Sequence, residues 1–270
     1  MHVWLNGRVV NPADAHIGVD DHGLVVGGGG FETLKVVRGQ AFALSRHIRR
    51  LSRTLSALAI PEPDEVVLRR AVAEVIEASG LRSGRVRLTV TGGGGSLGSA
   101  APTGPASVIA VIGELGALAR PTAITVPWTR NESGALAGLK TTSYAENVRA
   151  LRAAHQADAG EALFANSAGQ LCEGTGTNVF VVIDDDIITP PLSGGCLPGV
   201  TRGLVLEIAD VVERELPLEV LTTADEVFLT SSTRDVQGLI DVDGRSLAVG
   251  AKTRMVGAAF ADLVATDLDP

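Results

Sequence analysis

The first part of the chain alternates between strand spacing and helix spacing of its apolar residues. Strand patterns cover residues 4–10, 33–37, 86–90 and 107–112. Apolar and polar residues alternate at 86–90, which predicts one buried face, whereas 107–112 is apolar throughout and predicts a strand buried on both faces. Residues 48–58 and 67–76 repeat their apolar side chains three and four positions apart, as one face of a helix does. The pattern predicts a small domain of mixed α and β structure over residues 1–113.

The apolar residues at 114–121 follow neither strand nor helix spacing, so we predict that this segment connects two domains. Beyond it, strand patterns lie at 123–126 and 226–230, hairpin turns at 168–169 and 184–186, and helix patterns at 144–159, 202–213 and 251–265. The strands outnumber the regularly spaced helices that a doubly wound parallel sheet requires. We therefore predict an α+β fold whose second, larger domain covers residues 122–270.

Composition narrows the possible classes of function. The net charge is −8 with 23 Lys and Arg residues, which argues against a nucleic-acid binder, because such a protein needs a basic face to neutralise phosphates. No apolar run is long enough to span a membrane, and the first residues show neither a basic leader nor an apolar stretch. We therefore expect no nucleic-acid partner, no membrane partner and a cytoplasmic location.

Cysteine and histidine usage gives no indication of a metal centre. The two cysteines, Cys172 and Cys196, are too few and too isolated for a disulfide framework or a structural zinc site. The five histidines show no metal-ligand spacing. We predict two reduced, small apolar cysteines and no metal.

Two glycine clusters invite a nucleotide-binding interpretation. Residues 93–98 match G-x-G-x-x-G after a strand, but Pro102 and Pro105 follow and would not open the helix that holds a pyrophosphate. Residues 27–30 lack the Gly-Lys-Ser/Thr ending of a P-loop. We predict a loop at the first cluster, and at the second a close approach of the backbone to another segment or to a ligand.

Lys140 and Glu173 together indicate a pyridoxal phosphate (PLP) site. Lys140 follows the apolar and small residues 135–139, an unusual place for a surface charge, although a solvated lysine is the commoner occurrence. A lysine in such surroundings can act as a nucleophile and general base. Glu173 begins a glycine-rich turn, 173–178, where a carboxylate could be held beneath a cofactor ring. The lysine would bind the cofactor aldehyde, and the carboxylate would bind the pyridine nitrogen.

Three segments could supply the phosphate site that PLP also requires. Residues 197–202 lead into a helix, whose N-terminal N–H groups and Thr201 hydroxyl suit a dianionic phosphate. Residues 230–233 end a strand with four consecutive hydroxyl side chains. Arg50 adds a cation on a helix that is apolar on one face. Each segment alone would be an ordinary cap, turn or surface residue.

Six segments, in this order, resemble the class IV aminotransferases. They are 30–34, 47–51, Lys140, 173–180, 197–202 and 228–233, and the resemblance covers nearly the whole chain. This family has PLP fold type IV and includes D-amino-acid transaminases, R-selective amine transaminases, branched-chain aminotransferases and aminodeoxychorismate lyase. The resemblance implies a small N-terminal α/β domain and a larger C-terminal domain, an open β-barrel with flanking helices. It also implies a homodimer.

The resemblance further assigns roles to individual residues. Lys140 would form a Schiff base with PLP and then carry a proton between the substrate Cα and the cofactor C4′, while Glu173 would pair with the pyridine nitrogen. Tyr144 would approach the phenolic oxygen of the cofactor. The phosphate would be bound by the backbone N–H groups of Val200 and Thr201 and by the side chains of Arg50, Thr201, Ser231 and Ser232.

Substrate contacts are expected from four more positions. Phe31 and Thr33 match residues that line the active site, and Trp128 and Arg130 precede the lysine segment where several family members recognise substrate. Arg130 could bind a substrate carboxylate through a charge-assisted pair. At position 22 related proteins often carry an arginine, and this chain has His22.

The main functional hypothesis is a transaminase that moves an amino group from a D-amino acid or an R-amine to an α-keto acid. The alternatives are 4-amino-4-deoxychorismate lyase, which Thr33 favours, and a branched-chain aminotransferase, which usually carries glycine at that position. Two other classes stay open, namely a noncatalytic PLP-binding protein and a nucleotide-binding dehydrogenase.

Overall fold

The computed structural model describes residues 1–270, which form two compact units. The first unit comprises Met1–Gly116, Leu139–Tyr144 and Asp267–Pro270, and the second comprises Ala117–Gly138 and Ala145–Thr266. The chain therefore leaves the first unit within residues 114–121 and returns to it twice, once with the segment that carries Lys140. The domain prediction contained no such returns.

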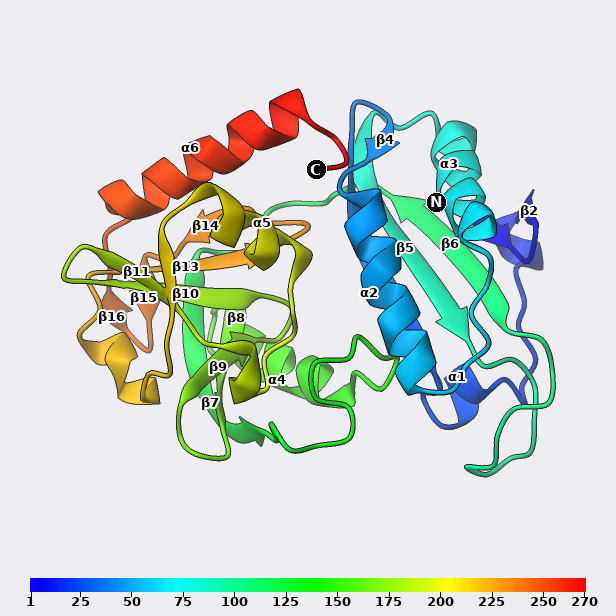
Figure 1. Ribbon diagram of the computed structural model, residues 1–270, viewed down its shortest axis with the longest axis horizontal. Helices are drawn as coiled ribbons and strands as arrows, with labels where there is room; N and C mark the ends of the chain where they lie inside the picture. The colour runs from blue at the N-terminus through cyan, green and yellow to red at the C-terminus, as the bar shows by residue number, and fades with distance from the viewer. The chain divides into compact units, whose positions relative to one another are not determined.

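An antiparallel six-stranded sheet and two helices form the first unit (Figure 1). In spatial order its strands are β2 (Arg8–Val10), β1 (His2–Leu5), β6 (Ser107–Gly113), β5 (Ser83–Thr91), β3 (Gly29–Val37) and β4 (Gln40–Ala41). Helices α2 (Leu44–Ala57) and α3 (Glu65–Ser79) pack on one face, and the short α1 (His22–Val25) and a 3-10 turn (Pro12–Asp14) precede β3. The helices expected at 48–58 and 67–76 are confirmed.

The core of the first unit lies between this sheet and its helices. Alternate strand residues such as Leu34, Leu88 and Ala110 are buried there against apolar residues of α2 and α3. In β6 the burial alternates along the strand, so the expectation that 107–112 is buried on both faces is wrong. The burial alternates because α2 and α3 cover only one face of the sheet. One continuous strand at 4–10 is also wrong, because Asn6 and Gly7, with φ of 45° and 109°, turn the chain into a hairpin.

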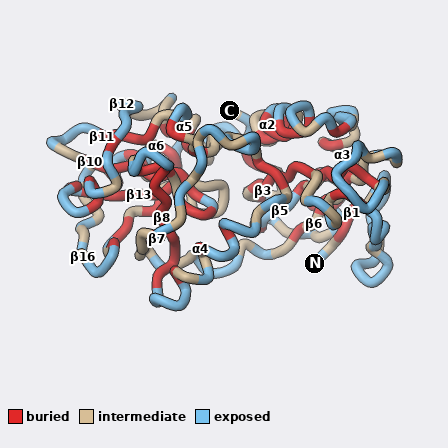
Figure 2. Tube along the Cα trace, turned by 90° about the horizontal axis from the view of Figure 1, so that it is seen from below, coloured by how far each residue is buried: buried red, intermediate tan, exposed pale blue.

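Two five-stranded sheets share one core in the second unit. The first has the order β12 (Val211–Glu213), β11 (Asp186–Thr189), β10 (Asn178–Ile183), β13 (Glu226–Ser231) and β14 (Asp235–Gly238). The second has the order β16 (Arg245–Ser246), β15 (Asp241–Val242), β7 (Thr122–Arg130), β8 (Glu161–Asn166) and β9 (Leu171–Gly174). Apolar side chains of both sheets meet in this core, which is buried along β8, β10 and β13 (Figure 2).

Three helices and two 3-10 turns complete the second unit. They are α4 (Ala145–Gln156), α5 (Val200–Ile208), α6 (Ala251–Thr266), and the turns Leu192–Gly194 and Leu218–Thr222. The hairpins expected at 168–169 and 184–186 are confirmed by the antiparallel pairs β8–β9 and β10–β11. The helix expected at 202–213 ends at Ile208, because Ala209 is extended and Val211–Glu213 pairs with β11 instead. None of the helices is both long and apolar enough to cross a lipid bilayer.

The segment Asp267–Pro270 caps the start of α2. Ala43 precedes this helix with a φ of 54° and offers no capping side chain. Asp269 takes over that role, since its Oδ1 accepts a hydrogen bond from Ser45 N at 2.8 Å and its Oδ2 accepts one from Ser45 Oγ at 2.5 Å. Leu268 O accepts a further bond from Ala43 N at 2.7 Å.

We expect Asp269→Ala to lower the free energy of unfolding by about 1 kcal/mol, because the first N–H groups of α2 lose their acceptor. Denaturant unfolding of the variant and wild type measures this difference. Asp262→Ala, on the exposed side of α6, is the matched control. Equal losses in the two variants would contradict the capping role.

Candidate active site

Backbone hydrogen bonds hold Lys140 along the edge of β3. Phe31 N donates to Lys140 O at 3.0 Å, and Thr142 N donates to Gly29 O at 2.8 Å, so the segment continues the sheet beside Gly30. On its other side Lys140 N donates to Thr54 Oγ1 of α2 at 3.2 Å. The backbone of Lys140 is thus fixed to both the sheet and the helix of the first unit.

Glycines at 27–30 allow the segment that carries Lys140 to lie close to the start of β3. A Cβ atom on Gly29 would lie 2.7 Å from Val90 O and 3.2 Å from Thr142 Oγ1. Gly27 has a φ of 67° and faces Ser143, while Thr142 Oγ1 donates to Gly27 O at 2.8 Å. The expected close approach of this glycine run to another chain segment is confirmed. No helix follows Gly98, in agreement with the loop expected at 93–98.

Two aromatic rings surround the Lys140 amine. Its Nζ lies 4.5 Å from the centre of the Phe31 ring and 5.4 Å from that of Tyr144. These rings meet edge to face, with centroids 5.1 Å apart. Lys140 is 9% exposed, so the amine lies in a largely apolar, confined position. Such surroundings suit a lysine that acts as a nucleophile and base.

Arg87 is a candidate residue that the sequence prediction missed. It lies opposite Thr33 in the β3–β5 pair, so both side chains project from the same face of the sheet as Phe31. The Arg87 guanidinium carbon lies 3.7 Å from the centre of the Phe31 ring. The alternation at 86–90 had already indicated that Arg87 faces away from the core, but not which residues lie beside it.

Arg50 lies on the helix-covered side of the same sheet, in an ion pair with Glu32. Its Nε donates to Glu32 Oε1 at 2.8 Å and its Nη2 donates to Oε2 at 2.5 Å. The ring of His47 contacts the same carboxylate, with Nδ1 and Oε2 2.6 Å apart. Burial opposes ionisation of Glu32, but the Arg50 guanidinium and the His47 ring together lower its pKa to about 2.

Glu173 is held by two partners in the second unit. Leu197 N donates to its Oε2 at 2.8 Å, and Arg130 Nε lies 3.1 Å from its Oε1. The Arg130 Nε–H does not point at that oxygen, so the second contact is ionic without an aligned hydrogen bond. Leu197 and Arg130 thus contact different oxygens of the Glu173 carboxylate.

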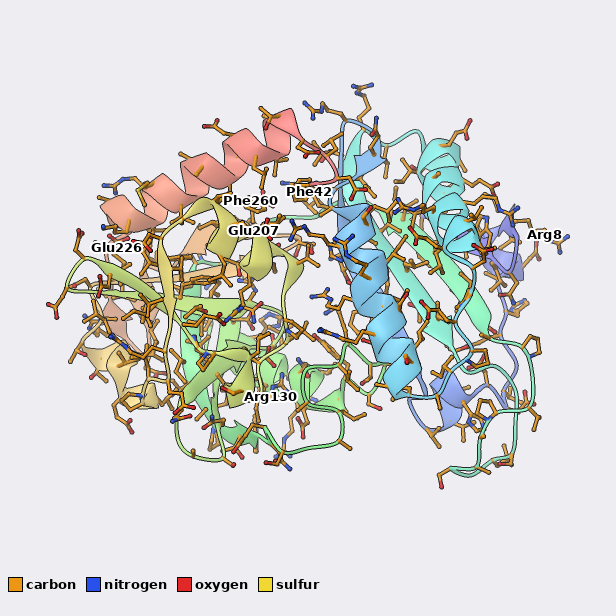
Figure 3. The ribbon with its side chains drawn as sticks, viewed as in Figure 1. Arg8, Phe42, Arg130, Glu207, Glu226 and Phe260 are labelled. Atoms are coloured by element: carbon orange, nitrogen blue, oxygen red, sulfur yellow. The ribbon has the colours of Figure 1, made fainter.

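Arg130 and Trp128 are close to α4. Arg130, labelled in Figure 3, ends β7 and donates from Nη1 to Glu146 Oε2 at 3.1 Å. Its guanidinium carbon lies 4.0 Å from the centre of the Phe164 ring. Trp128 lies beneath Arg149, 4.3 Å from the guanidinium carbon to the ring centre. The proposed role of Arg130 with a substrate carboxylate stays a prediction, since two protein carboxylates already contact this side chain.

The start of α5 and the end of β13 lie together. Asn178 pairs with Thr230 across the β10–β13 ladder, and its Nδ2 donates to Leu197 O at 2.8 Å. Gly199 then begins α5 without a capping side chain, which leaves the N–H groups of Val200 and Thr201 at the helix N-terminus. Ser231 and Ser232 follow Thr230 directly. The backbone N–H groups of a helix N-terminus and a run of hydroxyl side chains are groups that can bind a phosphate.

Glu161 supports this arrangement and was also missed. It is 1% exposed, and its carboxylate accepts hydrogen bonds from Thr175 N at 3.0 Å and from Thr177 Oγ1 at 3.2 Å. Arg234, just beyond the hydroxyl run, contacts Glu161 Oε2 at 3.1 Å. One buried carboxylate therefore joins the turn after Glu173 to the segment after Ser232. The sequence does not indicate this role, because a single glutamate in a strand belongs to no motif.

The candidate residues divide between the two units, and their chemistry fits PLP. The first unit holds Phe31, Thr33, Arg50, Lys140 and Tyr144, and the second holds Trp128, Arg130, Glu173, Val200, Thr201, Ser231 and Ser232. The first unit provides a confined amine, and the second provides a carboxylate, an uncapped helix N-terminus and hydroxyl groups. Thr230 Oγ1, next to Ser231, is buried without a hydrogen-bond partner within the protein. A lysine amine, a carboxylate for the ring nitrogen and donors for a phosphate are the kinds of group that bind PLP.

Comparison with known proteins gives a consistent result. The model of the family "Amino-transferase class IV" matches residues 29–240. A putative branched-chain-amino-acid aminotransferase of Methanocaldococcus jannaschii is 33% identical, over 97% of this chain and 96% of the relative. A bifunctional aminodeoxychorismate lyase / D-amino acid transaminase of Mycobacterium tuberculosis is 30% identical, over 98% and 97%.

A solved structure agrees with both the fold and the cofactor. It is the PLP-bound form of a hypothetical aminotransferase from Mycobacterium tuberculosis, with a TM-score of 0.88 and 26% identity, over 98% of this chain and 99% of that one. The predictions of fold type IV, of PLP and of an enzyme are confirmed. The chain belongs to the class IV aminotransferases, a family of PLP-dependent enzymes of fold type IV.

Proposed function

We propose that the protein transfers an amino group from a D-amino acid or an R-amine to an α-keto acid. The observation that carries this proposal is the placement of Lys140. Hydrogen bonds fix its backbone, and its amine lies beside the rings of Phe31 and Tyr144. A lysine that must hold a cofactor and then move a proton needs such confinement.

Lys140 has two tasks in this proposal. PLP, when bound, supplies an electron sink that stabilises negative charge at the substrate Cα. Lys140 Nζ would hold the aldehyde carbon of the bound cofactor until an incoming amine takes its place. The freed Nζ would then act as the base that takes the proton from the substrate Cα and as the acid that returns it. Because the Lys140 backbone is held on both sides, only its side chain moves between these positions.

The other candidate residues bind and orient the cofactor. Glu173, fixed by Leu197 N and Arg130, accepts a hydrogen bond from the pyridine nitrogen. The N–H groups of Val200 and Thr201, with Arg50, Thr201, Ser231 and Ser232, bind the phosphate. Tyr144 approaches the phenolic oxygen, and its ring stays in place against Phe31.

We propose Arg87 as the residue that binds the substrate carboxylate. It lies beside Phe31 on the sheet face that also carries Thr33. Thr33 adds a side chain on this face where branched-chain aminotransferases usually carry glycine, and a larger side chain there would favour a small donor such as D-alanine over a branched one. Thr33 thereby supports the D-amino-acid type over the branched-chain type.

We expect Arg87→Gln to raise the KM for D-alanine by roughly 10- to 100-fold, the effect of one lost charge-assisted hydrogen bond. An R-amine without a carboxylate should keep its KM within about twofold of wild type, since it makes no such bond. Steady-state kinetics with both donors measures the difference. Arg85→Gln, two positions earlier on the same strand, is the control. An equal rise in KM with both donors would contradict the role of Arg87 in binding the substrate carboxylate.

Aminodeoxychorismate lyase activity is the second candidate. The relative that is 30% identical is described as both a lyase and a D-amino acid transaminase. Both reactions begin with removal of a proton by the lysine and differ in whether the proton reaches C4′ or pyruvate leaves. A branched-chain donor is a further candidate, because the relative that is 33% identical is a putative branched-chain aminotransferase.

A donor screen tests these candidates. D-amino acids, L-branched amino acids and R-amines are each supplied with an α-keto acid, and aminodeoxychorismate is supplied alone. We expect fastest transfer from a D-amino acid. Pyruvate release from aminodeoxychorismate as the only activity would replace transamination by the lyase function. Absence of turnover with every donor would contradict the proposed amino transfer.

We also propose that the protein is a homodimer. The sheet face opposite α2 and α3 contains an apolar hollow lined by Met1, Val3, Leu5, Pro12, Ala15, Ile17, Ile109 and Val111. Nearby in the sequence, Val19 and Leu24 are 83% and 64% exposed. Exposed apolar surface of this kind is typical of an association site. Sedimentation equilibrium should give twice the chain mass of 27.8 kDa. The cytoplasmic location stays a prediction.

A further inference from the structure

A carboxylate lies among the core positions of β3. Leu34 and Val36 of this strand are packed beneath α2 and α3, and Glu32 projects from the same side and is 0% exposed. An unpaired charge there would cost several kcal/mol in folding free energy, so the chain must provide partners for it. Helix α2 provides them with His47 and Arg50, three positions apart on its buried face.

The pairing fixes the orientation of the Arg50 guanidinium. Both oxygens of Glu32 accept hydrogen bonds from Arg50, through Nε and Nη2, in a bidentate arrangement. Burial lowers the pKa of His47, although the charge of Glu32 opposes this, so the ring is neutral at pH 7 and donates from Nδ1. Three hydrogen bonds thus keep Glu32 and Arg50 in one geometry.

The same elements also hold Lys140. Thr54, one turn after Arg50, donates to Arg50 O at 3.1 Å and accepts from Lys140 N at 3.2 Å. Phe31, the neighbour of Glu32, donates to Lys140 O at 3.0 Å. Arg50 and Lys140 are therefore tied to each other through β3 and α2, by contacts that lie wholly within the first unit.

We propose that Glu32 is a positioning residue that sets the Arg50 guanidinium at a fixed place relative to Lys140, so that Arg50 binds the phosphate of a cofactor bonded to Lys140. This inference rests on the proposed phosphate role of Arg50. Glu32 touches neither cofactor nor substrate and acts through Arg50 alone. A purely structural ion pair would stabilise the fold without affecting recognition of the phosphate.

The test compares PLP with pyridoxal, which lacks the phosphate. Each is titrated into apoprotein, and its dissociation constant is measured from the absorbance of the lysine-bound form. We expect Glu32→Gln to raise the dissociation constant of PLP by about tenfold or more, because the substitution weakens the contact with the phosphate. The dissociation constant of pyridoxal should stay within about twofold of the wild-type value. An equal rise in both dissociation constants, or no rise in either, overturns the proposal.

Glu226→Gln is the matched control for loss of a buried carboxylate. Glu226, labelled in Figure 3 beside the start of α6, accepts hydrogen bonds from Thr253 N at 2.8 Å and Lys252 N at 3.2 Å. Its replacement should lower stability and leave the ratio of PLP to pyridoxal affinity unchanged. A fall in that ratio equal to that of Glu32→Gln would show a general effect of destabilisation and overturn the proposal.

Two further variants keep the test decisive. Glu32→Asp retains the buried charge but withdraws it by one methylene group, so it folds more readily than Glu32→Gln and should still reduce the preference for PLP. In an Arg50→Gln background, adding Glu32→Gln should cause no further loss, because the two residues act as one unit. An additional loss there overturns the proposal. Amino transfer from D-alanine by the wild type tests the proposed function separately.

Discussion

Lys140→Ala is expected to abolish turnover, with a loss of roughly 10⁴-fold or more, because one residue supplies both the covalent attachment and the general base. The variant should also lose the absorbance of the lysine-bound cofactor, while its fold changes little. The contacts that mount this segment are made by the backbone atoms of Lys140 and by Thr142, and an alanine retains the backbone donors and acceptors.

Absorbance spectra and steady-state rates of the PLP-loaded proteins measure these effects. Lys252→Ala is the control, since the Lys252 side chain forms an ion pair with Asp185, whose side chain is 84% exposed. It should keep both the spectrum and the rate. Retention of the lysine-bound absorbance in Lys140→Ala would show that another lysine carries the cofactor.

Glu173→Gln is expected to slow amino transfer by roughly 10²- to 10³-fold, a typical loss for one preorganised electrostatic contact. Glutamine still accepts a hydrogen bond from Leu197 N, so the turn is preserved, but it lacks the negative charge that favours a protonated pyridine nitrogen. The cofactor should stay bound to Lys140 and become a weaker electron sink. Single-turnover rates with D-alanine, at saturating donor, measure the chemical step.

Glu146→Gln is the matched control for this substitution. Glu146 and Glu173 both contact Arg130, at 3.1 Å each, but the side chain of Glu146 is 77% exposed. If the charge at Glu173 acts on the cofactor, Glu146→Gln should stay within about twofold of wild type. Similar losses in the two variants would instead indicate that both carboxylates act by orienting Arg130.

Local patterns predicted most of the secondary structure because they depend on neighbouring residues. The alternation at 86–90 and the helical spacing at 48–58 each report which side of an element faces a core, and the structure agrees. The pattern at 107–112 misled because an apolar strand can be only half covered, and coverage depends on elements elsewhere in the chain.

Candidate residues can be proposed from the sequence where a motif surrounds them. Lys140, Glu173 and the segments near Thr201 and Ser232 lie in such runs, and the family match confirms the cofactor. Arg87 and Glu161 have no motif, and their importance follows from cross-strand neighbours and buried hydrogen bonds. Arg50 was predicted, but its pairing with Glu32 depends on how α2 packs on β3, which local sequence does not encode.

The most direct test of the central claim identifies the lysine that carries PLP. The chain has three lysines, Lys35, Lys140 and Lys252. Borohydride reduction of the PLP-loaded protein makes the bond permanent, and peptide mass mapping then locates the label. We expect one label per chain, on Lys140. A label on Lys35 or Lys252, or no label on a protein that transfers amino groups, would contradict it.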